Sequence, residues 1–143
     1  MLVHLASWPI IESMGAYLNT AKKMYQMALA ELQQWKHARD KVVLQEAAEK
    51  AWGAITQASN ELIKAYGRPV PHRTNARRRA LSALEEQHRA LETLRLPDTF
   101  AAAEYMLRNG CFYEGNCSPE ELVHMIRVRT KQFLETVEQA SKR

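Results

Sequence analysis

Cysteine, glycine and proline are scarce in this sequence, and it contains no long run of apolar residues. Two cysteines, Cys111 and Cys117, are too few for a disulfide-rich scaffold in a chain of 143 residues. Five glycines and five prolines exclude collagen-like and linker-like chains. No apolar run approaches the roughly 18 residues that indicate a membrane span, and the first residues lack the basic region of a signal peptide. We therefore expect a soluble, cytoplasmic protein with no membrane partner.

Helix-forming residues dominate the composition. The chain is 46% hydrophobic and 25% charged, and it contains 20 alanines and 15 leucines. Its apolar residues recur at three- and four-residue spacing, which is typical of amphipathic helices. The pattern predicts a single all-α domain over residues 1–143, an antiparallel up-and-down bundle of about five helices. These helices are expected at roughly 8–37, 40–66, 74–95, 97–113 and 118–141.

Local signals mark several of the expected helix ends. Ser7 is a candidate cap for the first helix, Asp40 for the second, and Gly67 a candidate stop for the second. Ser118, followed by Pro119 and two glutamates, predicts a capping box at the start of the last helix.

Two polar residues fall on apolar helical stripes. His88 is expected to be a packed core histidine. Arg77 lies four residues before Leu81 on the same stripe. An arginine at such a position snorkels at the end of a core or points into a dimer seam.

Positive charge is concentrated in one short stretch. Residues 64–95 hold eight of the 20 basic residues and three of the 16 acidic ones. Arginine outnumbers lysine 12 to 8 in the chain, and its planar guanidinium suits two-point contacts to phosphate. A solvated basic loop and helix face is the alternative interpretation. The candidate nucleic-acid contacts in this stretch are Arg68, His72, Arg73, Arg78 and Arg79.

The cysteines and histidines do not form a recognisable metal signature. Cys111, Cys117 and His124 could converge on zinc, but three ligands without a Cys-x-x-Cys pair are a weak signal. Free, buried thiols are the expected state of the two cysteines, and a loop-closing disulfide is the alternative. No glycine-rich phosphate loop is present. We therefore expect neither a metal nor a cofactor.

The segment from Arg108 to Gly115 is an unusual way to end a helix. It combines Arg108 and Asn109 with two aromatic residues, Phe112 and Tyr113. A glycine stop accounts for the end of the helix but not for the arginine and tyrosine. The aromatic residues are expected to pack beneath the turn or between subunits.

Two segments carry a resemblance to a known family. The segment Gln45–Ile55 (QEAAEKAWGAI) resembles the AxEKxWGA helix of the archaeal PaREP family, and Cys111–Gly115 (CFYEG) resembles that family's later FYE segment. The resemblance covers about residues 14–139. PaREP proteins are related to the HEPN group of helical bundles, which is named for nucleotide binding. The resemblance therefore implies a HEPN-like bundle that dimerises.

The first of these segments also has a reading from its residues alone. Glu49, Lys50, Trp52 and Gly53 form its most specific piece. The glycine allows a neighbouring helix to approach and the tryptophan fills the space beside it, so we interpret the piece as specifying the fold. Glu46 and Lys50 are four residues apart, a spacing at which they can pair on the helix surface.

The resemblance also implies candidate catalytic residues. Many HEPN proteins carry an arginine, a polar residue and then a histidine, and the nucleases among them cleave RNA without metal. Arg108 and Asn109 match the start of that motif, but Tyr113 occupies the place where the histidine would be expected. A tyrosine with a pKa of about 10 is a poor general base near neutral pH. Arg108, Asn109 and Tyr113 are therefore interpreted first as a phosphate- or base-contacting cluster.

These observations favour a homodimeric module that binds RNA or nucleotides. One alternative is a protein-interaction partner of a nucleotidyltransferase, with no nucleic-acid role of its own. The other is a metal-independent ribonuclease whose Arg–His motif is degenerate, with His72 or His124 replacing the missing histidine in space. Binding without catalysis is the preferred interpretation.

Overall fold

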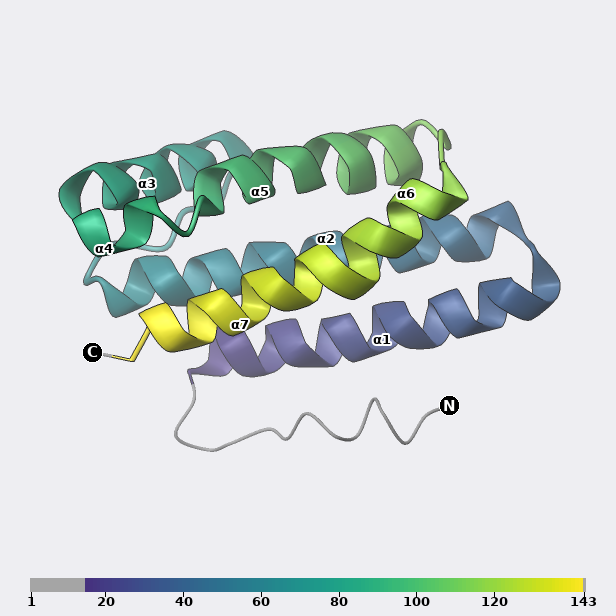
Figure 1. Cartoon of the computed structure of the whole chain (residues 1–143), viewed down its shortest axis with the longest axis horizontal. Coiled ribbons are helices and arrows are strands. Elements are labelled where there is room, and N and C mark those ends of the chain that lie inside the picture. The colour runs from purple at the N-terminus through teal and green to yellow at the C-terminus, as the bar shows by residue number, and fades with distance from the viewer. Residues whose placement is uncertain (1–14, 143) are drawn as a thin grey trace.

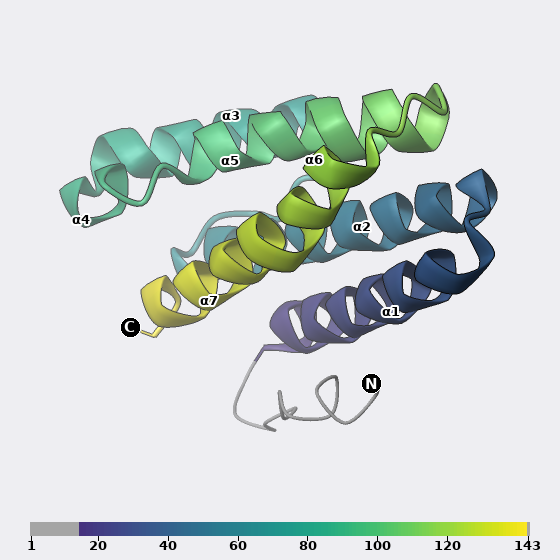
Figure 2. The ribbon, with the colours of Figure 1, turned by 45° about the vertical axis from the view of Figure 1, so that its right-hand side comes forward.

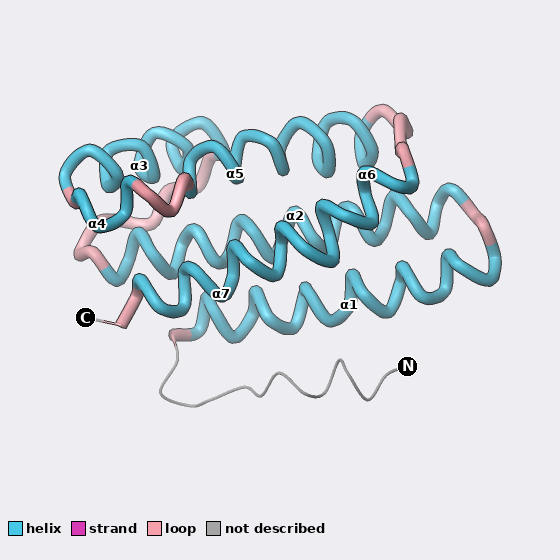
Figure 3. Tube along the Cα trace, in the orientation of Figure 1, coloured by secondary structure: helices cyan, strands magenta, loops and turns pink. Residues whose placement is uncertain are grey.

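A computed structural model describes residues 15–142, and the chain forms an all-α bundle over this range, as predicted. The expected start of the first helix near Ser7 lies outside the described residues. Figures 1 and 3 show helices joined by short connections. None of the described helices is long and apolar enough to cross a membrane. The elements are α1 (Ala16–Ala38), α2 (Lys41–Ala65), α3 (Thr74–Gln87), α4 (Arg89–Glu92), α5 (Leu96–Ala103), the π-helical segment η2 (Glu104–Tyr113), α6 (Pro119–His124), the π-helical segment η3 (Met125–Thr130) and α7 (Lys131–Ala140).

Helix α2 lies at the centre of the bundle. It packs against α1 and α7 on one side and against α3, α5 and η2 on the other (Figure 2). Several alanines of α2 are completely buried beneath the neighbouring helices, including Ala47, Ala51, Ala54 and Ala58. They let neighbouring helices approach closely on more than one side of α2.

Most helices that follow one another in the chain run antiparallel, with one exception. Asn60 of α2 contacts Arg77, whereas the later Tyr66 contacts His88, so α2 and α3 run in the same direction. The connection over residues 66–73 makes this possible because its two prolines keep it extended, and it passes back along α2 before α3 begins.

The predicted caps are partly realised. Asp40 caps α2, its carboxylate accepting a hydrogen bond from the Val42 amide at 2.9 Å, and Gly67 ends the helix in the left-handed region at φ 77°. Helix α6 begins after Ser118 as expected, but the predicted capping box is wrong because the serine side chain makes no capping hydrogen bond. At α1, Glu61 of α2 supplies the cap instead, accepting from the Leu18 amide at 3.2 Å.

The helix expected over residues 74–95 is broken at His88. The backbone there is extended, with φ −130° and ψ 97°, and the histidine ring lies edge-on to Tyr66 at 4.5 Å. His88 is half-buried rather than a core histidine. A second reversal at Arg95, with φ 55°, starts α5.

Arg77 neither snorkels nor faces a seam. It is 6% exposed, and its Nε donates to the Asn60 Oδ1 at 2.7 Å while Nη2 donates to the Pro71 carbonyl at 2.8 Å. Burial lowers the pKa of its guanidinium. The arginine therefore fixes the 66–73 connection to α2 from inside the molecule.

The piece Glu49–Gly53 organises close helix packing, as expected. A Cβ atom at Gly53 would collide with the Met24 side chain of α1, and the Trp52 ring packs against Phe100 of α5 at 5.1 Å between centroids. The possible Glu46–Lys50 pair does not form; the Lys50 ammonium lies 3.7 Å from the Glu31 carboxylate and 3.4 Å from that of Glu49.

Candidate functional site

The π-helical geometry of η2 brings Arg108 and Tyr113 together. Hydrogen bonds in a π-helix join residues five apart, so positions i and i+5 lie one above the other. The Arg108 guanidinium carbon lies 5.0 Å from the centre of the Tyr113 ring, within the range of a cation–π contact. Its Nη1 also lies 3.3 Å from the Asn109 Oδ1. The three residues singled out in the sequence thus form one contact cluster.

Glu104 joins this cluster to the basic stretch. Its side chain is 16% exposed, with Oε1 3.4 Å from the Arg78 Nη1 and Oε2 3.5 Å from the Arg108 Nη1. The carboxylate therefore holds an arginine from α3 beside an arginine from η2. We define the η2 surface as Arg78, Glu104, Arg108, Asn109 and Tyr113. Glu104 was not predicted, although its position four residues before Arg108 is a common spacing for a helical ion pair.

The aromatic residues of η2 are largely open to solvent. Tyr113 is 61% exposed and Tyr105 is 76% exposed. Phe112 is half-buried, and its ring centre lies 5.1 Å from that of Tyr113. Tyr113 therefore does not pack beneath the turn, and its packing between subunits, the other half of the expectation, stays a prediction.

The end of η2 is held by α2 and by a disulfide. Gln45 of α2 donates from Nε2 to the carbonyl oxygens of Cys111 and Phe112, at 3.2 and 3.3 Å. The two segments that carry the PaREP resemblance thus contact each other. Cys111 and Cys117 form a disulfide, which corrects the expectation of free thiols and removes both sulfurs from any zinc site.

Of the remaining basic candidates, one makes a side-chain hydrogen bond within the chain and three make none. The Arg68 guanidinium donates to the Gln87 side chain and so ties the start of the connection to the end of α3. His72, Arg73 and Arg79 are exposed, and within residues 15–142 their side chains make no hydrogen bond or ion pair. These three are free to contact a partner molecule.

Within residues 15–142, no hydrogen bond or ion pair joins a histidine to Arg108. The interactions of its side chain there are with Glu104, Asn109 and Tyr113. The sequence contains two Glu-x-x-His spacings, at Glu85 and Glu121, and such spacings occur in di-metal bundles. Within residues 15–142, however, no three side chains of the metal-ligating types come together.

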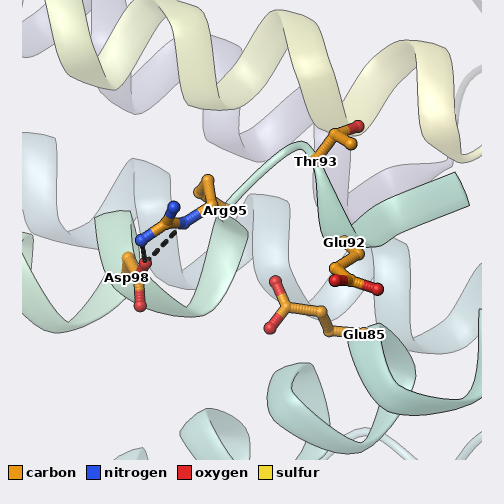
Figure 4. Close-up of a pocket in the computed structure, with 5 residues that line it drawn as sticks. All are labelled: Glu85, Glu92, Thr93, Arg95 and Asp98. Carbon is orange, nitrogen blue, oxygen red and sulfur yellow. Dashed lines mark hydrogen bonds and ion pairs between the residues drawn. The ribbon is translucent and has the colours of Figure 1, made fainter. Parts of the chain in front are cut away.

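A separate hollow of about 560 Å³ lies where α3, α4 and α5 meet. It is lined by Glu85, Glu92, Thr93, Arg95 and Asp98 (Figure 4), none of which is a predicted site residue. The Arg95 guanidinium turns toward Asp98, with Nη2 2.6 Å from Oδ2, and this contact raises the pKa of Arg95. The excess of carboxylates makes the hollow unsuited to a phosphate.

No protein-family model, no curated protein and no solved structure matches the chain. The class that the structure defines is an all-α bundle whose central helix contacts two groups of neighbours. Membership of the PaREP family and of the HEPN group stays a prediction from the residues.

Proposed function

We propose that the chain is a HEPN-like module that binds RNA or nucleotides as a homodimer, with the η2 surface as the contact site. The observation that carries the proposal is the Arg108–Tyr113 pair, in which a guanidinium lies against a solvent-exposed tyrosine ring. The PaREP resemblance supports the homodimer.

The two side chains provide complementary contacts to a nucleotide. An unpaired base can stack on an exposed tyrosine ring, and such stacking contributes about 1–3 kcal/mol per base. The guanidinium lies over one face of this ring, which leaves the other face for a base, and it can donate two hydrogen bonds to a phosphate. Glu104 orients both arginines, so less side-chain freedom is lost when a phosphate binds.

Positive charge continues from the η2 surface toward the start of α3. Arg78 faces Glu104, and the unengaged His72, Arg73 and Arg79 lie in the same turn of α3 or just before it. Basic residues that do not pair within the molecule are available to neutralise phosphates. Binding should therefore weaken steeply as salt is raised.

The same geometry favours binding over cleavage. Metal-independent cleavage needs a base for the 2′-hydroxyl proton beside the group that stabilises the phosphate. Within residues 15–142 the only carboxylate in contact with Arg108 is Glu104, which is already shared between two arginines. We therefore assign no catalytic role to Asn109 or Tyr113.

Fluorescence anisotropy with labelled single-stranded RNA, duplex RNA and ATP tests the proposal. Arg108→Ala should weaken binding at least tenfold, and Tyr113→Ala at least fivefold on single-stranded RNA. Arg95→Ala is the matched control, because Arg95 is also an ion-paired arginine but lies in the acidic hollow. The affinity of this variant for RNA should stay within twofold of the wild-type value. Recovery of intact RNA in EDTA checks the absence of cleavage, and sedimentation velocity measures the dimer.

Absence of binding to all three probes, or equal affinity of wild type and Arg108→Ala, would contradict the proposal. The η2 surface would then be examined as a contact for a protein such as a nucleotidyltransferase. RNA cleavage that disappears in Arg108→Ala would instead make Arg108 catalytic.

A further inference from the structure

The Cys111–Cys117 disulfide is placed to control the η2 surface. Cys111 lies in the last turn of η2, between Arg108 and Tyr113 in the sequence, and Cys117 lies two residues before α6 begins at Pro119. The bond therefore closes a short loop whose first residues carry the exposed tyrosine. Any change in this loop reaches the Arg108–Tyr113 contact through a few backbone bonds.

The two cysteines differ in their burial. Cys111 is completely buried, with Sγ 3.9 Å from the Leu44 carbonyl oxygen of α2. Cys117 is half-buried and stands between two exposed residues, Asn116 and Ser118. A thiolate from outside therefore reaches the Cys117 sulfur first.

Apart from the disulfide, the loop is held mainly by hydrogen bonds. The amides of Glu114, Gly115 and Asn116 donate to carbonyls of η2 at 2.7 to 3.1 Å, and Gln45 binds the Cys111 and Phe112 carbonyls. The side chains of Tyr113, Glu114 and Asn116 are exposed, so they contribute little apolar burial. Segments of this kind open at lower free energy than a packed core.

We propose that this disulfide is a redox latch that holds the Arg108–Tyr113 contact when oxidised and releases the loop when reduced. Its effect on binding rests on the function proposed above, whereas the release of the loop does not. A dithiol reductant acts in two steps. Its thiolate attacks the Cys117 sulfur, the bond to Cys111 breaks, and the Cys111 sulfur leaves with the electron pair and takes up a proton. The second thiol of the reductant then frees Cys117, so two thiols form in the protein and the reductant becomes a disulfide.

Amide hydrogen exchange by NMR tests the latch without any ligand. The full chain is compared after equilibration with oxidised and with reduced dithiothreitol, without denaturant. Reduction should speed exchange of the Glu114, Gly115 and Asn116 amides at least tenfold and leave α2 amides such as that of Ala54 within twofold. Cys117→Ser, which cannot form the disulfide, should show fast exchange of the loop amides in both buffers. If this variant does not fold, the comparison of oxidised with reduced wild type stands as the test.

Single-stranded RNA affinity measured on the same samples separates the two proposals. At least threefold weaker binding on reduction, together with faster exchange, supports both. Faster exchange with no RNA binding in either state supports the latch and overturns only the proposed function. Unchanged exchange after reduction, or a disulfide that dithiothreitol reduces only in denaturant, overturns the latch.

Discussion

Tyr25 shows how a buried hydroxyl is used to connect elements. It is 4% exposed, and its hydroxyl donates to the Arg127 carbonyl of η3 at 3.1 Å. Burial raises its pKa from 10.0 to about 12, an effect that the nearby Arg127 charge opposes and that of Glu135 reinforces. The neutral phenol is thus the form that the folded state stabilises.

The raised pKa of Tyr25 makes stability depend on alkaline pH. The pKa of Tyr25 is higher in the folded than in the unfolded state. The resulting contribution of Tyr25 to the free energy of unfolding is therefore complete below pH 10 and is lost as the pH rises toward about 12. Tyr25→Phe should cost about 1 kcal/mol near neutral pH through the lost hydrogen bond, and should lose less stability than wild type between pH 8 and 11. Urea unfolding at several pH values measures both. Parallel pH curves for the two proteins would contradict the assignment.

At the scale of elements, two helix starts that look alike in sequence differ in structure. Asp40 makes its capping hydrogen bond to Val42, whereas Ser118 makes none. Asp40→Ala should therefore cost about 1 kcal/mol of unfolding free energy, and Ser118→Ala less than about 0.5 kcal/mol. Urea midpoints of the two variants check this difference. Equal losses would show that Ser118 caps α6 in solution.

The π-helical segments depend on side chains that satisfy their carbonyls. In η3 the buried Thr130 hydroxyl donates to the Met125 carbonyl at 2.9 Å, across five residues. Thr130→Val keeps the shape but removes this buried hydrogen bond, so it should cost about 1 kcal/mol. Thr99→Val is a control, because its hydroxyl only accepts a long contact from Arg129 at 3.5 Å. Similar unfolding free energies for the two variants would argue against the role of Thr130.

Helix existence could be predicted from the sequence more readily than helix type. The spacing of apolar residues places α2 correctly, and Asp40 and Gly67 mark its ends. The same spacing assumes 3.6 residues per turn, so it gives no sign that residues 104–113 form a π-helix. Arg108 and Tyr113 were paired by resemblance to a motif, and the contact with Glu104 needed the structure because Arg78 belongs to another helix.

At the scale of the whole molecule, the basic stretch over residues 64–95 contains arginines that stabilise the fold and arginines that are available to a ligand, and composition cannot separate the two groups. Arg77 is buried and fixes the connection to α2, whereas Arg79, two positions later, is exposed, and its side chain makes no hydrogen bond or ion pair within residues 15–142. Their difference follows from the faces of α3 on which they lie, because Arg77 shares the buried stripe of Leu81 and Leu84 and Arg79 does not. The partners of Arg77 needed the structure, because Asn60 belongs to another helix and Pro71 to the connection.

This division predicts opposite effects for two matched substitutions. Arg77→Met removes both hydrogen bonds and leaves the Asn60 and Pro71 oxygens without their donor, so the unfolding free energy should fall by about 2–4 kcal/mol. Arg79→Met should change stability by less than about 0.5 kcal/mol. It should instead weaken binding of single-stranded RNA and lower the slope of log affinity against log salt by about 0.7, the value for one lost phosphate contact. Thermal unfolding and anisotropy titrations at several salt concentrations measure the two effects. An unchanged slope for Arg79→Met would remove this arginine from the interface, because a residue that contacts phosphate cannot be replaced without releasing fewer ions.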